Sequence, residues 1–387
     1  MPTQETLTIE KLVHGGEGLA RLEGKVVLIP YVLPGEIVQA KVERVKKDLF
    51  RGRLIEVISP SAARVSPPCP YFMHCGGCHY QHANTTYQVE QKVSILREAL
   101  RRVGKIEFSG EIPSISGDPW GYRNRVQLHI EDGGVGYFEH GSHSLCAIDS
   151  CAVACPLLND AFEKLNGESF LHLTTTVEFF ANDTETQVHV QDHIPAKAYR
   201  LFESLGTTGP IDYGGFRVSP NSFFQVNRFL IDALVQTATG DREGDWAVDL
   251  YAGVGLFSAR LSERFKIVTA VESSRAAFQD LLYNIERRTL PVTAENKSAE
   301  EYLGNLAQTP ELIMADPPRT GLGKEVVREL TRIRAPQLTI VSCDPATLAR
   351  DLQGLLAGCY RIDQITMVDL FPQTFHVETV VHLALGA

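Results

Sequence analysis

The sequence predicts an α/β protein with a small N-terminal β-barrel, a mixed α+β centre and a C-terminal doubly wound sheet of parallel strands. Three observations lead to this fold class. Short strands broken by Gly and Pro fill residues 1–58, as in a small barrel. Alternating strands occupy parts of the centre, and from about residue 216 short apolar runs alternate with helical stretches. Such alternation is the signature of a parallel sheet with crossover helices.

Length and composition set the class of protein. A chain of 387 residues, 44% hydrophobic and 22% charged, suggests an ordinary globular protein of two or three domains. No secretory leader and no apolar stretch of 18 residues is visible, so we expect a cytoplasmic protein that does not cross a membrane. The eight cysteines are too few for a disulfide scaffold, and their clustering favours metal or catalytic roles.

Charge is unevenly distributed along the chain. The net charge is −10, yet residues 1–110 carry an excess of positive charge and residues 111–387 an excess of negative charge. Local clusters govern attraction to nucleic acid more than the total does. One dense basic run fits either RNA contact or a solvated strand edge, and the sequence leaves both open; its members are Lys41, Arg44, Lys46, Lys47, Arg51 and Arg53.

The first half of the chain divides into recognisable elements. Barrel strands are expected at 7–13, 25–32, 36–45 and 51–58, followed by a Pro/Ser linker at 59–70. Apolar residues spaced by three and four predict a helix over 84–104; they are Val89, Val93, Leu96, Leu100 and Val103. In the centre, strand-like alternation falls within 121–145 and 171–191, with strands at 125–131, 177–183 and 187–192.

The C-terminal third contains the strands and helices of the expected parallel sheet. Strands are predicted at 246–250, 266–272, 311–316 and 337–342, and helices at 273–288 and 323–334. In such sheets ligands bind outside the carboxyl ends of the strands. The polar residues that follow each apolar run are therefore candidates for a binding site.

A glycine-rich turn follows the first of these strands. Asp249 lies near the strand end, Gly253 and Gly255 form the turn, and Glu272 ends the next strand. Glycines let the backbone approach a ligand closely, and a carboxylate at the second strand can accept both hydroxyls of a ribose. Because no third glycine or Walker lysine follows, S-adenosylmethionine fits better than a dinucleotide or triphosphate. Asp316, in an Asp-Pro-Pro sequence, supplies a second residue at the mouth.

Cys343 ends the 337–342 strand and precedes a helix start, where the helix dipole and backbone N–H groups favour a thiolate. We predict that it is a nucleophile rather than an inert thiol. Asp344 would oppose the thiolate unless its carboxylate caps the following helix. Cys359 lacks such a context and is interpreted as structural. Glu378 is either a general base or an exposed surface residue, and spacing alone does not choose between these.

A second group of cysteines has metal-ligand spacing. Cys69-x5-Cys75-x2-Cys78 is followed by three further cysteines, at positions 146, 151 and 155. Three close cysteines and one distant one suit a [4Fe–4S] cluster. A four-cysteine zinc site is the alternative, although zinc ribbons more often use paired Cys-x2-Cys turns.

Taken together, these motifs resemble the RNA (uracil-C5)-methyltransferase family, which makes 5-methyluridine in rRNA and tRNA. The likeness runs from end to end: HGGEGLARLEGKVVLIPYVLPGE resembles the TRAM domain, an OB-like barrel, and CPYFMHCGGC the iron–sulfur triplet. Further motifs follow in the family's order: SPNSFFQVN, DLYAGVGLF, DPPRTGLG, SCDPATLARD and FPQTFHVE. The resemblance implies a TRAM domain at 1–60, an iron–sulfur domain at 61–215, with helix 84–104 packed on the catalytic domain, and a Rossmann-like methyltransferase domain at 216–387.

The resemblance also implies roles for individual residues. Cys343 would be the nucleophile and Glu378 the base. The S-adenosylmethionine site would be lined by Gln225, Tyr251, Glu272 and Asp316. The fourth cluster ligand would be Cys151, five positions before Pro156, which leaves Cys146 and Cys155 spare. Asp344 stands where relatives often have Asn.

These predictions define one enzyme and two alternatives. The enzyme would transfer a methyl group from S-adenosylmethionine to C5 of a loop uridine in rRNA or tRNA, through a covalent bond from Cys343 to C6, without an obligatory protein partner. One alternative is an RNA-binding iron–sulfur protein without catalytic activity. The other is an RNA N-methyltransferase that uses the Asp-Pro-Pro motif.

Overall fold

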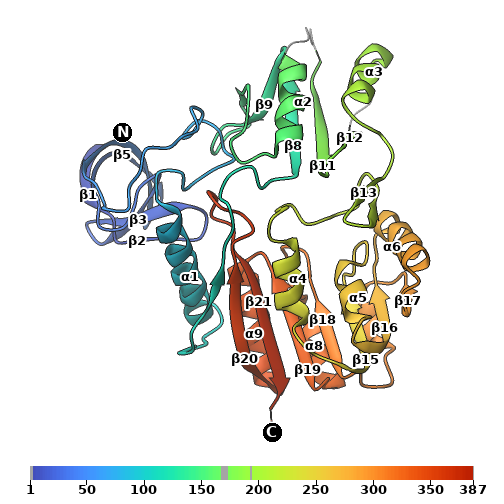
Figure 1. The fold of residues 1–387 in the computed structure, drawn as a ribbon. Coiled ribbons are helices and arrows are strands. Elements are labelled where there is room, and N and C mark those ends of the chain that lie inside the picture. The colour runs from blue at the N-terminus through green and yellow to red at the C-terminus, as the bar shows by residue number, and fades with distance from the viewer. Residues whose placement is uncertain (1–2, 167–172, 192–193, 387) are drawn as a thin grey trace.

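The structure is a computed structural model that describes residues 3–166, 173–191 and 194–386. Three large sheets follow one another along the chain (Figure 1). The first forms the N-terminal barrel, the second stands above the third, and the third carries the C-terminal half of the chain. Among the described helices, none combines the length and apolar character that a membrane crossing requires.

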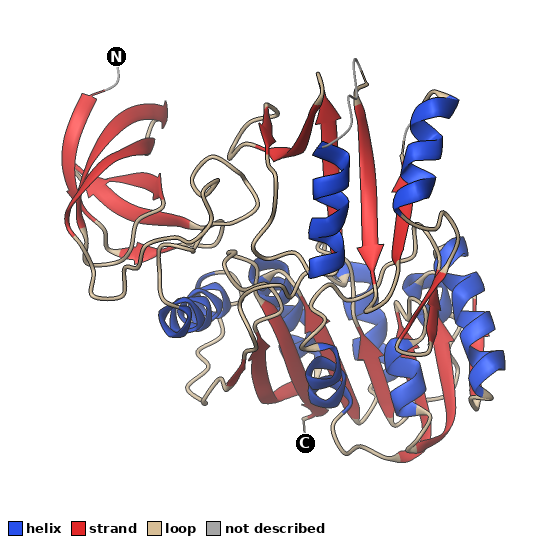
Figure 2. Ribbon diagram, turned by 45° about the horizontal axis from the view of Figure 1, so that its top comes forward, coloured by secondary structure: helices blue, strands red, loops and turns tan. Residues whose placement is uncertain are grey.

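The barrel is a six-stranded sheet curled around its own apolar core (Figure 2). Its strands, in spatial order, are β1 (Thr3–Thr8), β5 (Ile37–Lys46), β6 (Leu49–Ser59), β4 (Lys25–Pro30), β3 (Glu17–Leu22) and β2 (Lys11–Leu12). Strand β3 was not among the predicted strands, because the glycines on both sides of it indicated breaks. Those glycines form the turns, with positive φ at Gly16 and Gly24. The predicted basic run lies on β5, β6 and the turn between them, and all six of its side chains are exposed.

Helix α1 (Thr85–Arg102) matches the predicted helix to within two residues at its C-terminal end and one at its start. Asn84 caps its N-terminus by accepting a hydrogen bond from the Tyr87 N–H. The helix packs against the C-terminal half of the chain. The Lys92 ammonium is completely buried and lies 2.6 Å from the Asp369 carboxylate. A buried charge needs such a partner, so this ion pair holds α1 against the C-terminal half of the chain.

The central sheet is antiparallel, in the order β10-β9-β8-β11-β12. Its strands are β8 (Arg125–Glu131), β9 (Gly134–Phe138), β10 (Leu145–Ala147), β11 (Thr175–Ala181) and β12 (Thr186–Val190). Helices α2 (Pro156–Asn166) and α3 (Ala196–Leu205) contribute to its core. The predicted strands fall on β8, β11 and β12, whereas residues 171, 172 and 192 of those predictions lie outside the described residues.

The C-terminal sheet has eight strands in the order β17-β16-β15-β18-β19-β21-β20-β7. Its parallel strands are β17 (Val292–Glu295), β16 (Phe265–Val271), β15 (Gly244–Leu250), β18 (Leu312–Ala315) and β19 (Gln337–Ser342). The far side is formed by β21 (Glu378–Leu385), β20 (Tyr360–Val368) and the short β7 (Ser114–Ile115), and β21 runs antiparallel to both β19 and β20. Between the central and C-terminal sheets, β13 (Ile211–Tyr213) and β14 (Phe216–Val218) form a hairpin.

Helices cover both faces of the C-terminal sheet, as expected of a doubly wound fold. On one face lie α1, α7 (Ala299–Gly304), α8 (Gly323–Ile333) and α9 (Pro345–Gly358). The other face is covered by α4 (Ile231–Thr239) and α5 (Leu256–Leu261). Helix α6 (Arg275–Arg288) packs near β16 and β17. The predicted helices 273–288 and 323–334 correspond to α6 and α8.

Candidate active site

The register of the C-terminal sheet brings Cys343 and Glu378 together. Cys343 follows the last residue of β19, and Glu378 is the first residue of β21. In the antiparallel pairing of these strands Ser342 lies opposite Thr379, so the next pair in register is Cys343 and Glu378. An antiparallel strand begins at the edge where its parallel neighbours end. Glu378 therefore reaches the binding edge of the sheet, and it is 5% exposed rather than a surface residue.

The environment of Cys343 favours the protonated thiol. Burial, together with the carboxylates of Glu378 and Asp316, raises its pKa to about 12, although the Arg319 guanidinium acts in the opposite direction. The sequence predicted that the helix terminus would favour the thiolate. A backbone hydrogen bond does lower the thiol pKa, but in the free site desolvation and two neighbouring carboxylates outweigh it.

The buried Glu378 and the partly exposed Asp316 form an acidic pair. Burial and the repulsion of Asp316 raise the pKa of Glu378 well above its ordinary value, while Arg319 lowers it. For Asp316, burial and the nearby Asp249 carboxylate raise the pKa to about 7. Its Oδ2 accepts a 3.4 Å hydrogen bond from the amide of Gln225. A carboxyl group with a raised pKa exchanges protons near neutral pH, which is the property of a general acid or base.

Asp344 caps helix α9. Its Oδ1 accepts hydrogen bonds from the backbone N–H groups of Ala346, at 3.0 Å, and Thr347, at 2.8 Å. Its Oδ2 lies 3.3 Å from Nε2 of His14, a residue of the N-terminal barrel. These contacts hold the pKa of the Asp344 carboxyl well below its usual range, with the His14 hydrogen bond as the largest cause. The predicted capping role is confirmed.

The glycine-rich turn is built around two carboxylates. Asp249, completely buried at the end of β15, accepts a hydrogen bond from Ser258, and its Oδ1 has no hydrogen-bond partner among the described residues. Burial raises the Asp249 pKa to about 7. Glu272 accepts hydrogen bonds from the N–H groups of Gly253, at 2.9 Å, and Ser274, at 2.5 Å. Gly253 and Gly255 both have positive φ, a conformation that glycine adopts without strain.

The remaining predicted cofactor residues lie on either side of this turn. Gln225 is buried and contacts Asp316, as described above. Tyr251, directly after β15, has a φ of 61°, a strained value for a non-glycine residue that is common at functional sites. The charges that act on its hydroxyl are those of Glu300 and Asp351. The structure thus groups Cys343, Glu378, Asp316 and Gln225 and links them to Asp249 and Glu272. Tyr251 follows the same strand end, but its side chain packs toward the core that α7, α8 and α9 form on one face of the sheet.

Two residues that the sequence reading did not single out support the site. Arg319 follows Asp-Pro-Pro and is the cation that acts on both Cys343 and Glu378. Asp280 on α6 is completely buried and accepts hydrogen bonds from the Ser219 backbone N–H and hydroxyl and from the Ser222 hydroxyl. It thereby fixes the loop that leads to Gln225. Arg319 could have been found from its place in the motif, but Asp280 carries no local signal.

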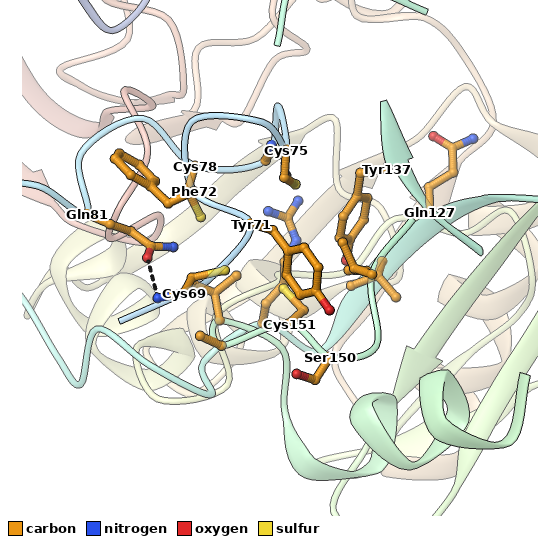
Figure 3. Close-up of a pocket in the computed structure, with 16 residues that line it drawn as sticks. Cys69, Tyr71, Phe72, Cys75, Cys78, Gln81, Gln127, Tyr137, Ser150 and Cys151 are labelled. Carbon is orange, nitrogen blue, oxygen red and sulfur yellow. Dashed lines mark hydrogen bonds between the residues drawn. The ribbon is translucent and has the colours of Figure 1, made fainter. Parts of the chain in front are cut away.

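The predicted metal ligands line one cavity. Cys69, Cys75, Cys78 and Cys151 all border a space of about 190 Å³, and Figure 3 shows their side chains facing it from two separate segments. Burial raises the pKa of Cys75 and Cys78 to about 12 and raises that of Cys151. The spare cysteines at 146 and 155 are not among the residues that line this cavity.

Side-chain amides orient two of these cysteines. The Cys69 N–H donates to Oε1 of Gln81 at 3.3 Å (Figure 3). The Cys151 N–H donates to Oδ1 of Asn159 at 2.8 Å, and the Asn159 amide donates back to the Cys151 carbonyl at 3.1 Å. Within residues 3–166, 173–191 and 194–386, no three Cys, His, Asp or Glu side chains are close enough together to hold a single metal ion.

Fold and site together define a class of protein: a Rossmann-like methyltransferase with an additional N-terminal barrel. Sequence comparison gives the family. Residues 213–385 match the tRNA (Uracil-5-)-methyltransferase family and residues 3–55 match the TRAM domain. An RNA methyltransferase of Aquifex aeolicus without a characterised function is 31% identical over 97% of each chain. A 23S rRNA (uracil(1939)-C(5))-methyltransferase of Halomonas elongata is 32% identical over 97% of this chain and 89% of its own.

A solved structure extends this agreement to the whole fold. The Pyrococcus abyssi tRNA (uracil-54, C5)-methyltransferase, determined in complex with S-adenosyl-L-homocysteine, is 27% identical and superposes with a TM-score of 0.76 over 98% of this chain and 100% of its own. The chain belongs to the RNA uracil-C5-methyltransferase family. It is an RNA uracil-5-methyltransferase, and the predicted family, enzyme class and fold class are confirmed.

Proposed function

We propose that this enzyme methylates C5 of a uridine in rRNA or tRNA with S-adenosylmethionine, through a covalent Cys343–uracil intermediate. The observation that carries the proposal is the pairing of a thiol and a buried carboxyl, Cys343 and Glu378, at the carboxyl edge of the sheet. An N-methyltransferase needs neither group, and a binding protein without activity would have no use for the pair.

The reaction proposed for Cys343 solves a problem of reactivity. C5 of uracil is too weak a nucleophile to take a methyl group unaided. The Cys343 sulfur, as thiolate, bonds to C6, and the electron pair of the C5–C6 double bond moves into an enolate that makes C5 nucleophilic. Because the thiol pKa is raised in the free site, the Cys343 proton must pass to solvent water before the sulfur attacks, and Arg319 is the nearby cation that favours the resulting thiolate.

Glu378 would complete the cycle. After C5 is methylated, the Glu378 carboxylate takes the proton from C5, the double bond re-forms, and the bond from C6 to the Cys343 sulfur breaks. The product is 5-methyluridine, Cys343 leaves as thiolate, and the proton resides on Glu378. Its raised pKa makes the Glu378 carboxylate a stronger base than an exposed glutamate would be.

The turn after β15 fits S-adenosylmethionine, which supplies an electrophilic methyl group on its sulfonium. Glu272 is held by two backbone N–H groups with its carboxylate at the position expected to accept ribose hydroxyls. Asp249 offers a buried oxygen that no group in the described part of the chain hydrogen-bonds. Gln225, Tyr251 and Asp316 would border the same ligand, and Gly253 and Gly255 would let it approach the backbone.

The cysteine cavity fits a [4Fe–4S] cluster held by Cys69, Cys75, Cys78 and Cys151. The donor set is four thiols, the ligand type that such clusters use. A volume of about 190 Å³ exceeds the roughly 30 Å³ that one water occupies, so the space suits a multi-atom group better than a single ion. Methyl transfer moves no electron, so we assign the cluster a structural role. Zinc in the same place is the alternative.

Three further expectations belong to this proposal. The target uridine lies in an RNA loop, since unstacking a base costs least there. The enzyme works in the cytoplasm, where rRNA and tRNA are modified. The chain comprises a TRAM domain at 1–60, a cluster domain at 61–215 and a methyltransferase domain at 216–387.

The test compares two cysteine variants. Cys343→Ala should abolish methyl transfer from radiolabelled S-adenosylmethionine to unmodified rRNA and tRNA, while cofactor binding by calorimetry stays intact. Cys359→Ala is the matched control, since Cys359 lies in the turn between α9 and β20 rather than at this edge, and it should retain activity. Transfer at a near wild-type rate by Cys343→Ala would end the covalent proposal. Nucleoside analysis of the product distinguishes 5-methyluridine from an N-methylated base.

A further inference from the structure

The turn between β2 and β3 of the barrel reaches the loops that carry the reactive groups. His14 lies in this turn, with its Nε2 3.3 Å from Oδ2 of Asp344. Its ring also meets the Phe375 ring edge-on, with 5.3 Å between centroids. Asp344 directly follows Cys343, and Phe375 precedes Glu378 by three residues. One barrel side chain therefore contacts both segments that present the reactive pair.

Backbone geometry holds this turn in place. The Val13 N–H donates to the Glu17 carbonyl at 2.9 Å, and the Gly16 N–H donates to the Val13 carbonyl at 3.3 Å. A Cβ at Gly16 would lie only 3.0 Å from side-chain atoms of His79, so the turn is in close contact with the neighbouring loop. His14 is consequently presented on a rigid support.

Both oxygens of Asp344 are engaged, one by the α9 backbone and one by His14. A carboxylate next to a thiol opposes the formation of the thiolate. A partner that donates a hydrogen bond to the carboxylate holds it in place and reduces that opposition.

We propose that His14 is a positioning residue for the methyl-transfer reaction. It holds the Asp344 carboxylate at the N-terminus of α9, so the position of the barrel against the catalytic half of the chain affects the reactivity of Cys343. The proposal rests on the function proposed above, in which Cys343 is the nucleophile.

Other charged groups surround Cys343 and His14. Cys343 is faced by Glu378, Asp316 and Arg319. Glu98 and Arg102 of α1 border a cavity together with His14, and Glu98 pairs with Lys11 of the barrel and with Arg102. The ring of His376 contacts that of Phe375, and the positive charge of Arg319 acts on it. Substitution of His14 or Asp344 leaves the chemical identity of all these side chains unchanged.

The test measures the thiol directly, without RNA or cofactor. The full-length protein is alkylated with iodoacetamide from pH 6 to 10, and the Cys343 peptide is quantified by mass spectrometry with the Cys359 peptide as internal reference. His14→Gln should slow Cys343 alkylation by about three- to tenfold at neutral pH, which corresponds to half a unit to one unit in the thiol pKa. The alkylation profile should move to higher pH.

Rescue and control variants separate positioning from a general effect of barrel docking. Asp344→Asn removes the charge and keeps the cap, since Asn caps helices as well as Asp. The double variant His14→Gln/Asp344→Asn should return to the wild-type alkylation rate. Lys11→Met removes a contact between the same barrel and α1 and should leave Cys343 alkylation unchanged.

Two results would overturn the inference: an unchanged alkylation profile in His14→Gln, or a slowed profile that Asp344→Asn does not restore. Neither result bears on whether Cys343 is the nucleophile. That question is answered separately by methyl transfer in Cys343→Ala.

Discussion

The thiol at the sheet edge and the thiols of the cysteine cavity are held in different ways. Cys343 follows a central strand, and the register of β19 and β21 sets its neighbour Glu378. The four cavity cysteines lie on loops, where side-chain amides such as Gln81 and Asn159 fix two of them. A strand edge positions its groups through many backbone hydrogen bonds at once. A loop site depends on a few side-chain contacts and on the group that it binds.

Of the variants that test this comparison, the largest loss of activity is expected when the proposed base, Glu378, is substituted. Glu378→Gln preserves shape and strand pairing but cannot accept the C5 proton. We expect turnover to fall by about 10²- to 10⁴-fold and a covalent protein–RNA adduct to accumulate, visible on a denaturing gel. The double variant Glu378→Gln/Cys343→Ala should form no adduct. A Glu378→Gln enzyme that turns over at the wild-type rate would remove this residue from the mechanism.

The cysteine cavity should respond to loss of one ligand. Cys151→Ser should lower bound iron per chain and the thermal midpoint, because the ordering of these loops depends on metal binding. Cys146→Ser is the matched control, since that thiol is near the cavity but does not line it, and it should keep its iron. Iron is measured by elemental analysis and visible absorbance. Stoichiometric zinc with no iron in the wild type would instead support the zinc alternative.

A smaller effect is expected at the cofactor turn. Glu272→Gln replaces a carboxylate that accepts two backbone hydrogen bonds. Hydrogen bonds to charged groups contribute about 1.5–3 kcal/mol, so the Kd for S-adenosylmethionine should rise by roughly one to two orders of magnitude. Calorimetric titration measures this change. Glu286→Gln, at an exposed position near the C-terminal end of α6, serves as the comparison and should bind the cofactor normally.

The smallest effect concerns the helix that follows the nucleophile. Asp344→Ala removes both hydrogen bonds that cap α9, and loss of an N-cap costs about 1 kcal/mol. Asp344→Asn should keep that stability. Denaturant unfolding of the two variants measures the difference, and equal stabilities would show that the cap contributes little at this strand edge.

Much of the molecule could be predicted from local sequence. The parallel strands β15, β16, β18 and β19, helices α1, α6 and α8, and the Asp344 cap followed from periodicity and from residues with clear terminal preferences, whereas the parallel strand β17 was not predicted. Strand β3 was not predicted, because its flanking glycines indicated breaks, whereas in the structure they form turns between paired strands. Asp280 carries no local signal either, since its partners Ser219 and Ser222 are about sixty residues away.

The sequence by itself determined which residues carry the chemistry: a thiol at a strand end, a glycine-rich turn with its acidic partner, and clustered cysteines. Each of these features depends on residues that lie close together in the sequence. Only the tertiary structure decided whether Glu378 was a surface residue or a partner of Cys343, and that burial keeps the thiol protonated in the free site. Those outcomes depend on the direction of one strand and on how much water surrounds each charge, and both are set by packing between distant segments.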